Sequence, residues 1–310
     1  KSDKGVDLAT ETVDSYQAAY ENLINGSSQA MVLNSAYSSL LELSYDDYES
    51  NLKTIYTYKI KKSVSSEAKS SDANVFNIYI SGIDTYGSIS TVSRSDVNII
   101  LTVNMNTHKI LMTTTPRDSY VQIPDGGANQ YDKLTHAGIY GVETSEKTLE
   151  NLYGIDINYY ARINFTTFMN LIDAIGGVTV YNDQAFTAYT NRNYSFEVGN
   201  VNLNSGEEAL AFVRERYGLD NGDYDRGNNQ IKVVQAIVNK LTSLNSVSNY
   251  SSITSMLTDS IQTNMSLDTM MVLANTQLDS GKKFTITSQE VTGTGSTGEL
   301  TSYAMPTASL

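Results

Sequence analysis

The chain has 310 residues, 21 lysines and arginines against 34 aspartates and glutamates, and a formal net charge of −13. An acidic chain repels a long polyanion, so a nucleic-acid partner is not expected. The absence of cysteine excludes a disulfide framework and a thiolate metal site. A hydrophobic content of 40% is typical of a globular protein, and no apolar run approaches the length of a membrane span.

The first part of the chain, residues 1–72, reads as a small accessory module with a linker. Its pattern predicts two amphipathic helices and then a half-buried strand, over residues 7–25, 28–43 and 52–60. The polar run 61–72 predicts the linker, which leaves 73–310 as the main domain. The leading module carries no set of residues that suggests chemistry.

Beyond the linker, strand-like and helix-like segments alternate, which predicts an α/β fold with a central mixed β-sheet flanked by helices. The strand candidates are 75–80, 97–103, 109–115, 159–163, 178–181 and 284–287. The helix candidates are 145–152, 165–175, 205–212, 228–244 and 267–278. The pair Gly176-Gly177 is a good helix terminator.

Charged residues at the ends of the first strands are expected to converge. Residues 104–107 read as a turn, and pairing about a centre near residue 106 sets Asp96 opposite Pro116 and beside Arg117. If the preceding strand pairs antiparallel with this hairpin, one end of the sheet carries Asp84, Arg94, Asp96 and Arg117. Two carboxylates amid arginines form a candidate site for Mg²⁺ (or Mn²⁺), with phosphate oxygens and water as further ligands.

The densest basic cluster lies at residues 214–230, although the chain has only seven arginines. Arginine binds phosphate oxygens two at a time, so the cluster indicates a pocket for one small, highly charged group such as a diphosphate. Arg214 and Arg216 share a face if their stretch is extended. Arg226 and Gln230 share a face at the start of a helix, near its positive end. Two aspartates remain to hold the arginine forks or to cap the helix: Asp223 and Asp225.

Plainer readings of the same residues stay open. Surface arginines often pair with acidic neighbours at little gain in stability. Asp84 and Asp96 are also compatible with simple turn residues, and Lys133 with a solvated side chain.

The motifs, taken in order, resemble the LytR-CpsA-Psr family over residues 75–245, and the leading module resembles that of streptococcal capsule-type members. The resemblance rests on Gly82-Ile83-Asp84, Arg94-Ser95-Asp96, Pro116-Arg117-Asp118, Asp132-Lys133-Leu134, Asp173 to Val178, Leu203 to Leu210, Arg214-Glu215-Arg216 and Asp223 to Gln230. The chain departs from the family pattern in two places, at Asn228-Asn229 before Gln230 and at Thr135-His136 after Leu134.

The resemblance implies a phosphotransferase that attaches a polyprenyl-diphosphate-linked glycopolymer, capsular polysaccharide or teichoic acid, to peptidoglycan and releases polyprenyl phosphate. It also implies a long apolar lipid pocket and a place on the extracellular face of the membrane, held by segments ahead of Lys1. Carried over by position, the residues that bind the diphosphate and its metal are Asp84, Asp96, Arg117, Arg214, Arg216, Arg226 and Gln230, with Arg94 beside them.

Two rival functions remain at this point. A pyrophosphatase differs only in using water as the acceptor, and a lipid-binding sensor would hold a prenyl phosphate without turnover. The paired acidic residues argue against the sensor, because a simple anion binder gains nothing from added negative charge. His108 and His136 are poorly placed as general bases, so Asp96 is the preferred base or base-orienting group.

Overall fold

The structure is a computed structural model, and it describes residues 9–13, 15–33, 41, 45, 47–56, 68, 74–243, 253, 261–297 and 302–306. The chain divides into two compact units, residues 1–62 and 63–310, which are described separately here. Among the described residues, no helix combines the length and the apolar character that crossing a membrane requires.

The first unit contains less regular structure than the sequence pattern predicts. Helix α1 (Tyr16–Ile24) begins where Ser15 accepts a hydrogen bond from the Ala18 backbone N–H, and the short helix α3 spans Tyr48–Asn51. The predicted elements were wrong over residues 9–13 and 28–33, which are not helical, and over 52–56, which form no strand. Residues 57–60 and most of 34–43 lie outside the described residues, as does nearly all of the predicted linker.

The second unit is built on a mixed six-stranded sheet with the order β11-β6-β1-β2-β3-β12. The β1-β2 and β2-β3 pairs are antiparallel, as is β11-β6, whereas β6 runs parallel to β1 and β12 parallel to β3. The predicted fold class is therefore confirmed. The strands span Val75–Gly82 (β1), Val97–Asn104 (β2), Lys109–Thr114 (β3), Tyr159–Ile163 (β6), Gln262–Thr263 (β11) and Thr285–Glu290 (β12).

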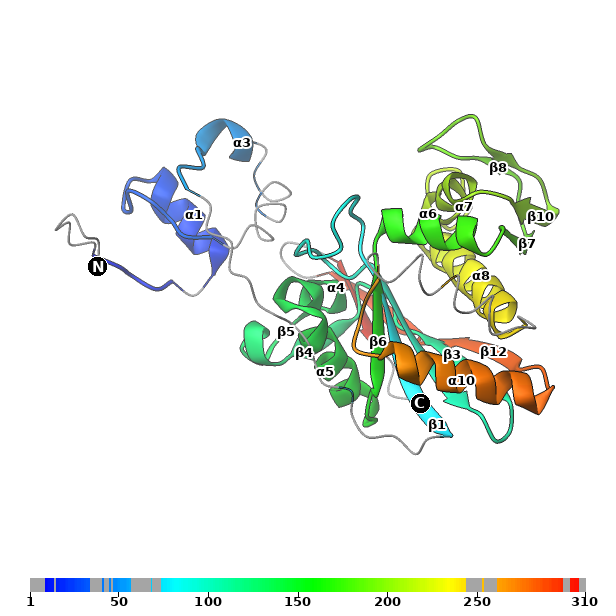
Figure 1. Ribbon diagram of the computed structural model, residues 1–310. Helices are drawn as coiled ribbons and strands as arrows, with labels where there is room; N and C mark the ends of the chain where they lie inside the picture. Colours follow the sequence, from blue (N-terminus) through cyan, green and yellow to red (C-terminus); the bar gives the residue numbers. More distant parts are fainter. Residues whose placement is uncertain are drawn as a thin grey trace. The chain divides into compact units, whose positions relative to one another are not determined.

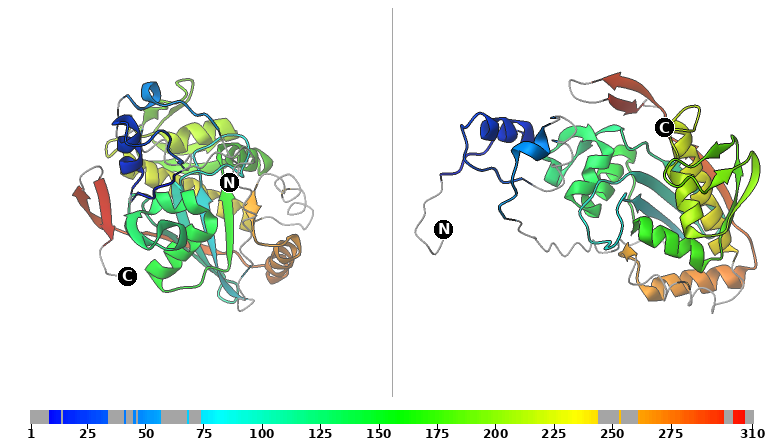
Figure 2. Two further views of the ribbon diagram at one scale, coloured as in Figure 1. Left: turned by 90° about the vertical axis from the view of Figure 1, so that its left-hand side faces the viewer. Right: turned by 90° about the horizontal axis from the view of Figure 1, so that it is seen from above.

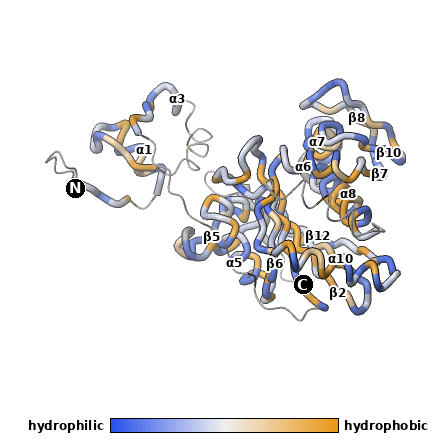
Figure 3. The backbone as a smooth tube through the Cα atoms, in the orientation of Figure 1, coloured by the Kyte–Doolittle hydropathy of each residue, from blue (hydrophilic) through white to orange (hydrophobic). Residues whose placement is uncertain are grey.

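Alternation along the strands sends apolar side chains to both faces of the sheet, so helices cover both (Figures 1 and 2). One face packs against α4 (Leu134–Ala137) and α5 (Val142–Tyr153), which lie beside the β4-β5 pair, Tyr120–Ile123 and Gln130–Lys133. The other face packs against α8 (Asp223–Thr242) and α10 (Leu267–Ser280). Figure 3 shows apolar residues concentrated along the central strands.

A further apolar core lies beyond α8 and gathers α6 (Phe165–Ala174) and α7 (Gly206–Arg214). Asn164 and Ser205 cap these helices by accepting hydrogen bonds from Thr167 and Glu208 backbone N–H groups. The predicted strand at 178–181 exists as β7 (Val178–Asn182), but its assignment to the central sheet was wrong. Among the described strands it pairs with β10 (Gly199–Leu203) and no other, and the chain between them forms the small pair β8 (Phe186–Thr187) and β9 (Ser195–Phe196).

The other described elements are two 3-10 turns and a hairpin close to the carboxyl end of the chain. They span Asp125–Gly127 (η2), Gly138–Tyr140 (η3), Gly293–Thr297 (β13) and Ser302–Pro306 (β14).

Candidate functional site: a charged cavity beside the sheet

The ends of β1, β2 and β3 bring the first group of predicted residues together. Gly82 pairs with Val97, and the Asp96 backbone N–H donates to the Gly82 carbonyl at 2.8 Å, so the Asp84 and Asp96 segments leave the sheet side by side. The hairpin register pairs Asn104 with Lys109, which places Asp96 opposite Arg117 and not opposite Pro116. The predicted register is thus displaced by one residue.

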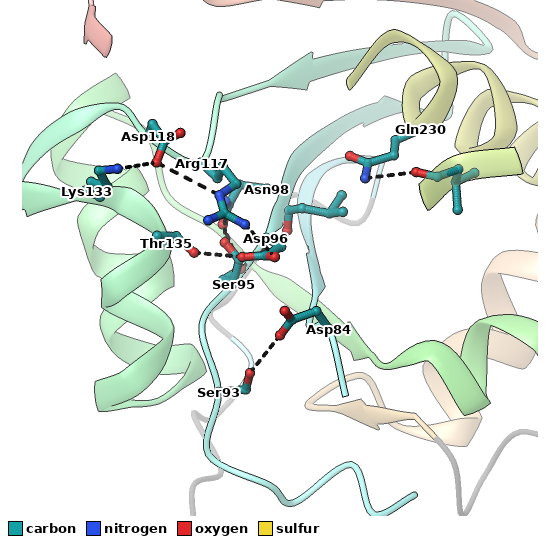
Figure 4. A network of polar contacts seen from close by, with 12 residues as sticks. Asp84, Ser93, Ser95, Asp96, Asn98, Arg117, Asp118, Lys133, Thr135 and Gln230 are labelled. Atoms are coloured by element: carbon teal, nitrogen blue, oxygen red, sulfur yellow. Dashed lines mark hydrogen bonds and ion pairs between the residues drawn. The ribbon is translucent and has the colours of Figure 1, made fainter. Parts of the chain in front are cut away.

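The Asp96 carboxylate is held by two side chains and is largely withdrawn from water (Figure 4). Arg117 Nη1 lies 2.6 Å from Asp96 Oδ2, and Thr135 Oγ1 donates to Asp96 Oδ1 at 2.9 Å. Burial raises the pKa of Asp96 more than the Arg117 charge lowers it. The negative charge of Asp84 also raises this pKa, whereas the Thr135 hydrogen bond and the positive charge of Arg94 lower it.

A buried polar network fixes the segment that carries Asp96. The Ser95 hydroxyl lies 2.9 Å from both the Tyr79 and Ser81 hydroxyls and donates to Asn98 Oδ1 at 2.8 Å. All four residues are at most 2% exposed. Gly138 also packs against this segment, because a Cβ there would lie 2.6 Å from the Ser95 backbone nitrogen. The network is satisfied internally and orients the neighbouring carboxylate.

The end of β5 and the helix α4 that follows it contribute more than the sequence predicted. Lys133 is not a solvated side chain: it is 15% exposed and its Nζ lies 3.0 Å from Asp118 Oδ1, next to Arg117. His136 is buried and pairs through Nδ1 with Asp132 Oδ2 at 2.7 Å. The departure from the family pattern at Thr135 therefore supplies the hydroxyl that contacts Asp96.

A cavity of about 370 Å³ lies between the sheet and helices α6, α7 and α8. Strands β1, β2 and β6 form one wall, and the three helices form the other. Its charged and polar lining includes Asp84, Asp96, Arg214, Arg216, Arg226 and Gln230. Its apolar lining includes Ile80, Val97, Ile163, Phe168, Leu210, Val213 and Val234. Members of the two predicted groups thus meet in one cavity, Asp84 and Asp96 from the first and residues within 214–230 from the second. Arg94 and Arg117 are not among the lining residues, and Arg117 pairs with Asp96, which is.

Arg214 and Arg216 line this cavity, but the stretch is not a continuous extended segment, which was the condition for a shared face. Arg214 is the last residue of α7, and Glu215 after it has an extended backbone. The Arg214 guanidinium lies 4.5 Å from the centre of the Phe165 ring and donates to the Tyr86 hydroxyl at 3.2 Å. Arg216 lies 5.0 Å from the centre of the Tyr217 ring. Within the described part of the chain neither has a carboxylate partner within 4.0 Å, so the surface ion-pair reading does not apply to them.

Glu215 is a positioning residue that the sequence reasoning missed. It is 1% exposed, and its carboxylate accepts hydrogen bonds from the backbone N–H groups of Tyr189, Arg216 and Gly218. The signal available in the sequence was an acidic residue between two arginines, which suggests ion pairing. Instead, Glu215 fixes the backbone on which Arg216 stands.

Helix α8 begins at Asp223, five residues earlier than predicted, so Arg226 lies in its first turn and Gln230 one turn later. Gln230 Nε2 donates to the Val213 carbonyl at 3.4 Å, which ties α8 to the end of α7. Asp225 does not hold an arginine fork. It accepts from the Asn221 backbone N–H at 2.9 Å and from Gln184 Nε2 at 2.9 Å, and the Asn221 hydrogen bond lowers its pKa. Gly222 is the N-cap residue of α8, and the side chain of Asp223, the other predicted cap, lies outside the described part of the structure.

A buried arginine that was not predicted supports the loop between Asp84 and Arg94. Arg162 is 7% exposed, and it donates to the Ile89 and Thr91 carbonyls at 2.6 and 2.7 Å. It therefore stabilises the loop backbone without lining the cavity. His108 lies at the opposite end of the hairpin, as expected.

The donor set is compatible with a hard cation but not with a protein-only metal cage. Among the described residues, no group of three or more His, Asp or Glu side chains is arranged to hold a metal ion. The cavity does present two carboxylates, Asp84 and Asp96, beside arginines that attract phosphate. Mg²⁺ commonly binds through one or two carboxylates plus substrate phosphates, so these residues fit that mode.

Comparison with known proteins gives a consistent family assignment. A teichoic acid transferase of Enterococcus faecalis, named polyisoprenyl-teichoic acid–peptidoglycan teichoic acid transferase TagU, is 37% identical over 75% of this chain and 75% of its own. The structure of protein gbs0355 from Streptococcus agalactiae is 30% identical, with a TM-score of 0.68 over 78% of this chain and 86% of that one. The structure of TagT bound to LI-WTA is 28% identical, with a TM-score of 0.63 over 77% and 88% of the two chains. The model of the LytR_cpsA_psr family matches residues 43–310, and the chain belongs to this family.

Proposed function

We propose that the protein transfers a glycopolymer from a polyprenyl diphosphate carrier to peptidoglycan. The observation that carries this proposal is one cavity whose lining combines apolar side chains such as Leu210 and Val234 with the guanidinium groups of Arg214 and Arg216. We assign the apolar part to the lipid and the arginines to the phosphates. A prenyl diphosphate has the same division into an apolar chain and an anionic head. The similarity to TagU of Enterococcus faecalis supports the same reaction class.

The cavity suits the lipid in size as well as in chemistry. Ligand pockets usually measure about 300–1,000 Å³, and the observed 370 Å³ lies in that range. It accommodates the head group and the first part of a prenyl chain. The apolar wall is shared by the sheet and by three helices, so the chain would lie between Ile80 on β1 and Leu210 on α7.

The transfer is a displacement at the phosphorus that carries the glycopolymer. The hydroxyl oxygen of the peptidoglycan sugar forms the new phosphodiester bond to this phosphorus. The bond to the bridging oxygen breaks, and that oxygen leaves with polyprenyl phosphate. Such a reaction needs mainly alignment and neutralisation of charge that spreads over the phosphate oxygens. Three arginines around the cavity would align the diphosphate and neutralise its charge: Arg214, Arg216 and Arg226.

Asp96 is our candidate for the group that takes or orients the hydroxyl proton. Its raised pKa makes it a stronger base than an ordinary carboxylate, because burial makes the charged form less favourable. Arg117 and Thr135 hold it in one orientation. When bound by Asp84 and Asp96, Mg²⁺ or Mn²⁺ would neutralise charge on the diphosphate. If Asp96 binds the metal, its part in proton transfer is to orient the attacking group.

The rest of the assignment follows from the same reaction. The donor would be an anionic cell-wall polymer, teichoic acid or capsular polysaccharide, and the acceptor peptidoglycan. The reaction would occur on the extracellular face of the membrane, where both are accessible, with the protein held there by a membrane anchor. Hydrolysis of the diphosphate is a side activity expected whenever water replaces the sugar hydroxyl.

The experiment is a product analysis with and without acceptor. The protein is incubated with a prenyl-diphosphate-linked glycan and Mg²⁺, in the presence or absence of peptidoglycan fragments. The expected result is a glycan–phosphate–peptidoglycan conjugate and prenyl phosphate when the acceptor is present. Free glycan phosphate in equal amounts under both conditions would instead establish a pyrophosphatase, and an unchanged donor would establish a binding protein.

A further inference from the structure

Two exposed tyrosine rings stand side by side at the rim of the charged cavity. Tyr189 and Tyr217 both line it and are 60% and 70% exposed, and their ring centres are 4.8 Å apart with an angle of 55° between the ring planes. Covering an exposed aromatic ring with a ligand removes apolar surface from water, which favours binding. Rings at the rim of a cavity are well placed to make such a contact. Neither ring is needed to fill the apolar core.

The backbone beneath the two rings is rigidly tied to the phosphate-binding part of the cavity. The buried Glu215 carboxylate accepts hydrogen bonds from the backbone N–H groups of Tyr189 and Gly218, so it bridges the two loops that carry the rings. It also accepts from the Arg216 N–H. One carboxylate therefore fixes both tyrosines relative to Arg216, and the pair is organised before any ligand arrives.

The position of the two tyrosine rings relative to Arg216 indicates which part of the substrate they contact. The Arg216 guanidinium lies 5.0 Å from the centre of the Tyr217 ring. A phosphate bound by Arg216 therefore places its next substituent close to the ring pair. In the proposed reaction the prenyl chain occupies the apolar part of the cavity, so the substituent that points to the exposed rim is the sugar on the other phosphate. A pyranose ring has an apolar face of C–H groups, which packs on an aromatic ring.

We propose that Tyr189 and Tyr217 form a stacking platform for the first sugar of the donor, the pyranose linked directly to the diphosphate. This inference rests on the proposed function and adds to it a specificity-determining subsite. The platform would distinguish a glycosylated prenyl diphosphate from the bare lipid, while the arginines bind the diphosphate of both. Tyr189 is the cleaner position to test, because no contact of its ring with an arginine is seen in the described part of the chain.

The test compares two soluble probes of equal charge by calorimetry in Mg²⁺ buffer: farnesyl diphosphate carrying N-acetylglucosamine on its outer phosphate, and farnesyl diphosphate with a methyl ester there, which is the farnesyl diphosphate probe below. The parent protein should bind the sugar-bearing probe roughly fivefold to tenfold more tightly, as expected for one well-packed ring contact. Tyr189→Ala should remove this preference and leave farnesyl diphosphate binding unchanged, whereas Tyr189→Phe should retain it. Tyr217→Ala should weaken both probes, because its ring lies beneath Arg216.

The chain offers a matched control in a second tyrosine pair, of which one ring, that of Tyr131, is exposed. Tyr131 is 56% exposed, lies with its ring centre 5.3 Å from that of Tyr120, and does not line the cavity, so Tyr131→Ala should keep the full preference. A Tyr189→Ala protein that keeps the preference, or that loses affinity for both probes equally, overturns the platform. In transfer assays the donor KM should rise in this variant, and a rise in the acceptor KM alone would also overturn the donor assignment.

The result also separates this inference from the proposed function. Equal binding of the two probes by the parent protein overturns the platform alone. Binding of neither probe overturns the proposed function, and the platform with it.

Discussion

Replacing Asp96 by Asn tests the balance of forces on the central carboxylate. The pKa of Asp96 is raised in the folded protein, chiefly by burial, so its charged form is less favourable there than in the unfolded chain. A raised pKa means that the group's contribution to stability is greatest below its unfolded pKa of about 4 and declines as pH rises through the folded pKa. Ionisation of the buried Asp96 carboxyl therefore lowers the stability of the parent protein between pH 4 and pH 7. Asn cannot ionise, so Asp96→Asn removes this loss.

The size of the effect follows from the same comparison. Each unit by which the folded pKa exceeds the unfolded value corresponds to about 1.4 kcal/mol. This difference already contains the attraction of Arg117, which opposes the cost of burial wherever Asp96 is ionised, so the Arg117 hydrogen bond is not counted a second time. The free energy of unfolding of the variant, relative to that of the parent, should therefore increase between pH 4 and pH 7. This increase measures the cost of ionising Asp96 in the folded protein.

The assay is urea unfolding at several pH values, with Asp279→Asn, at an exposed position in the last turn of α10, as the matched control. Transfer activity should fall by about 10² or more in Asp96→Asn, as expected on loss of a general base or a metal ligand, and stay normal in the control. If the variant instead loses stability relative to the parent as pH rises, the attraction of Arg117 exceeds the cost of burial and our reasoning is refuted.

Four further substitutions, one of them with a matched control, test the cavity walls. Arg214→Lys and Arg216→Lys keep the charge but lose the two-pronged contact, so turnover should fall by roughly tenfold or more; parental kinetics would mean that they form no phosphate clamp. Glu215→Gln leaves one backbone N–H without an acceptor, which should cost about 1–3 kcal/mol in urea unfolding and lower turnover; unchanged stability would contradict its positioning role. Val234→Trp should fill the apolar part and abolish farnesyl diphosphate binding, whereas Val238→Trp, one turn further along α8 and outside the lining, reports on overpacking alone. Equal binding by both Trp variants would argue against the lipid pocket.

The sequence pattern predicted the elements that are long, periodic and buried. Residues 159–163 form β6 with the expected bounds, and 165–175 form α6 with its end one residue earlier. The hairpin prediction brought Asp96 beside Arg117 because alternation and a polar turn fix the strand pairing to within a residue. A one-residue error remained, since the turn places His108 at positive φ and shifts the centre of the hairpin.

Contacts between segments that are distant in the chain could not be predicted from the sequence. Nothing near Thr135 in the chain indicates that its hydroxyl contacts Asp96, 39 residues earlier. The helix predicted at 205–212 continues to Arg214, so the shared face that an extended stretch 214–216 would give Arg214 and Arg216 does not arise in that way. Segment 178–181 has the composition of a central strand, and only tertiary packing directs it to a separate pair with β10.

The central claim is that one cavity holds a prenyl chain and its diphosphate together, and native mass spectrometry tests it most directly. The purified parent protein, titrated with farnesyl diphosphate in Mg²⁺ buffer, should show a single 1:1 adduct. Val234→Trp should lose the adduct through its blocked apolar part, and a double Arg214→Lys, Arg216→Lys protein should lose it through its weakened anion clamp. An adduct that survives in both variants, or none in the parent, would contradict the account.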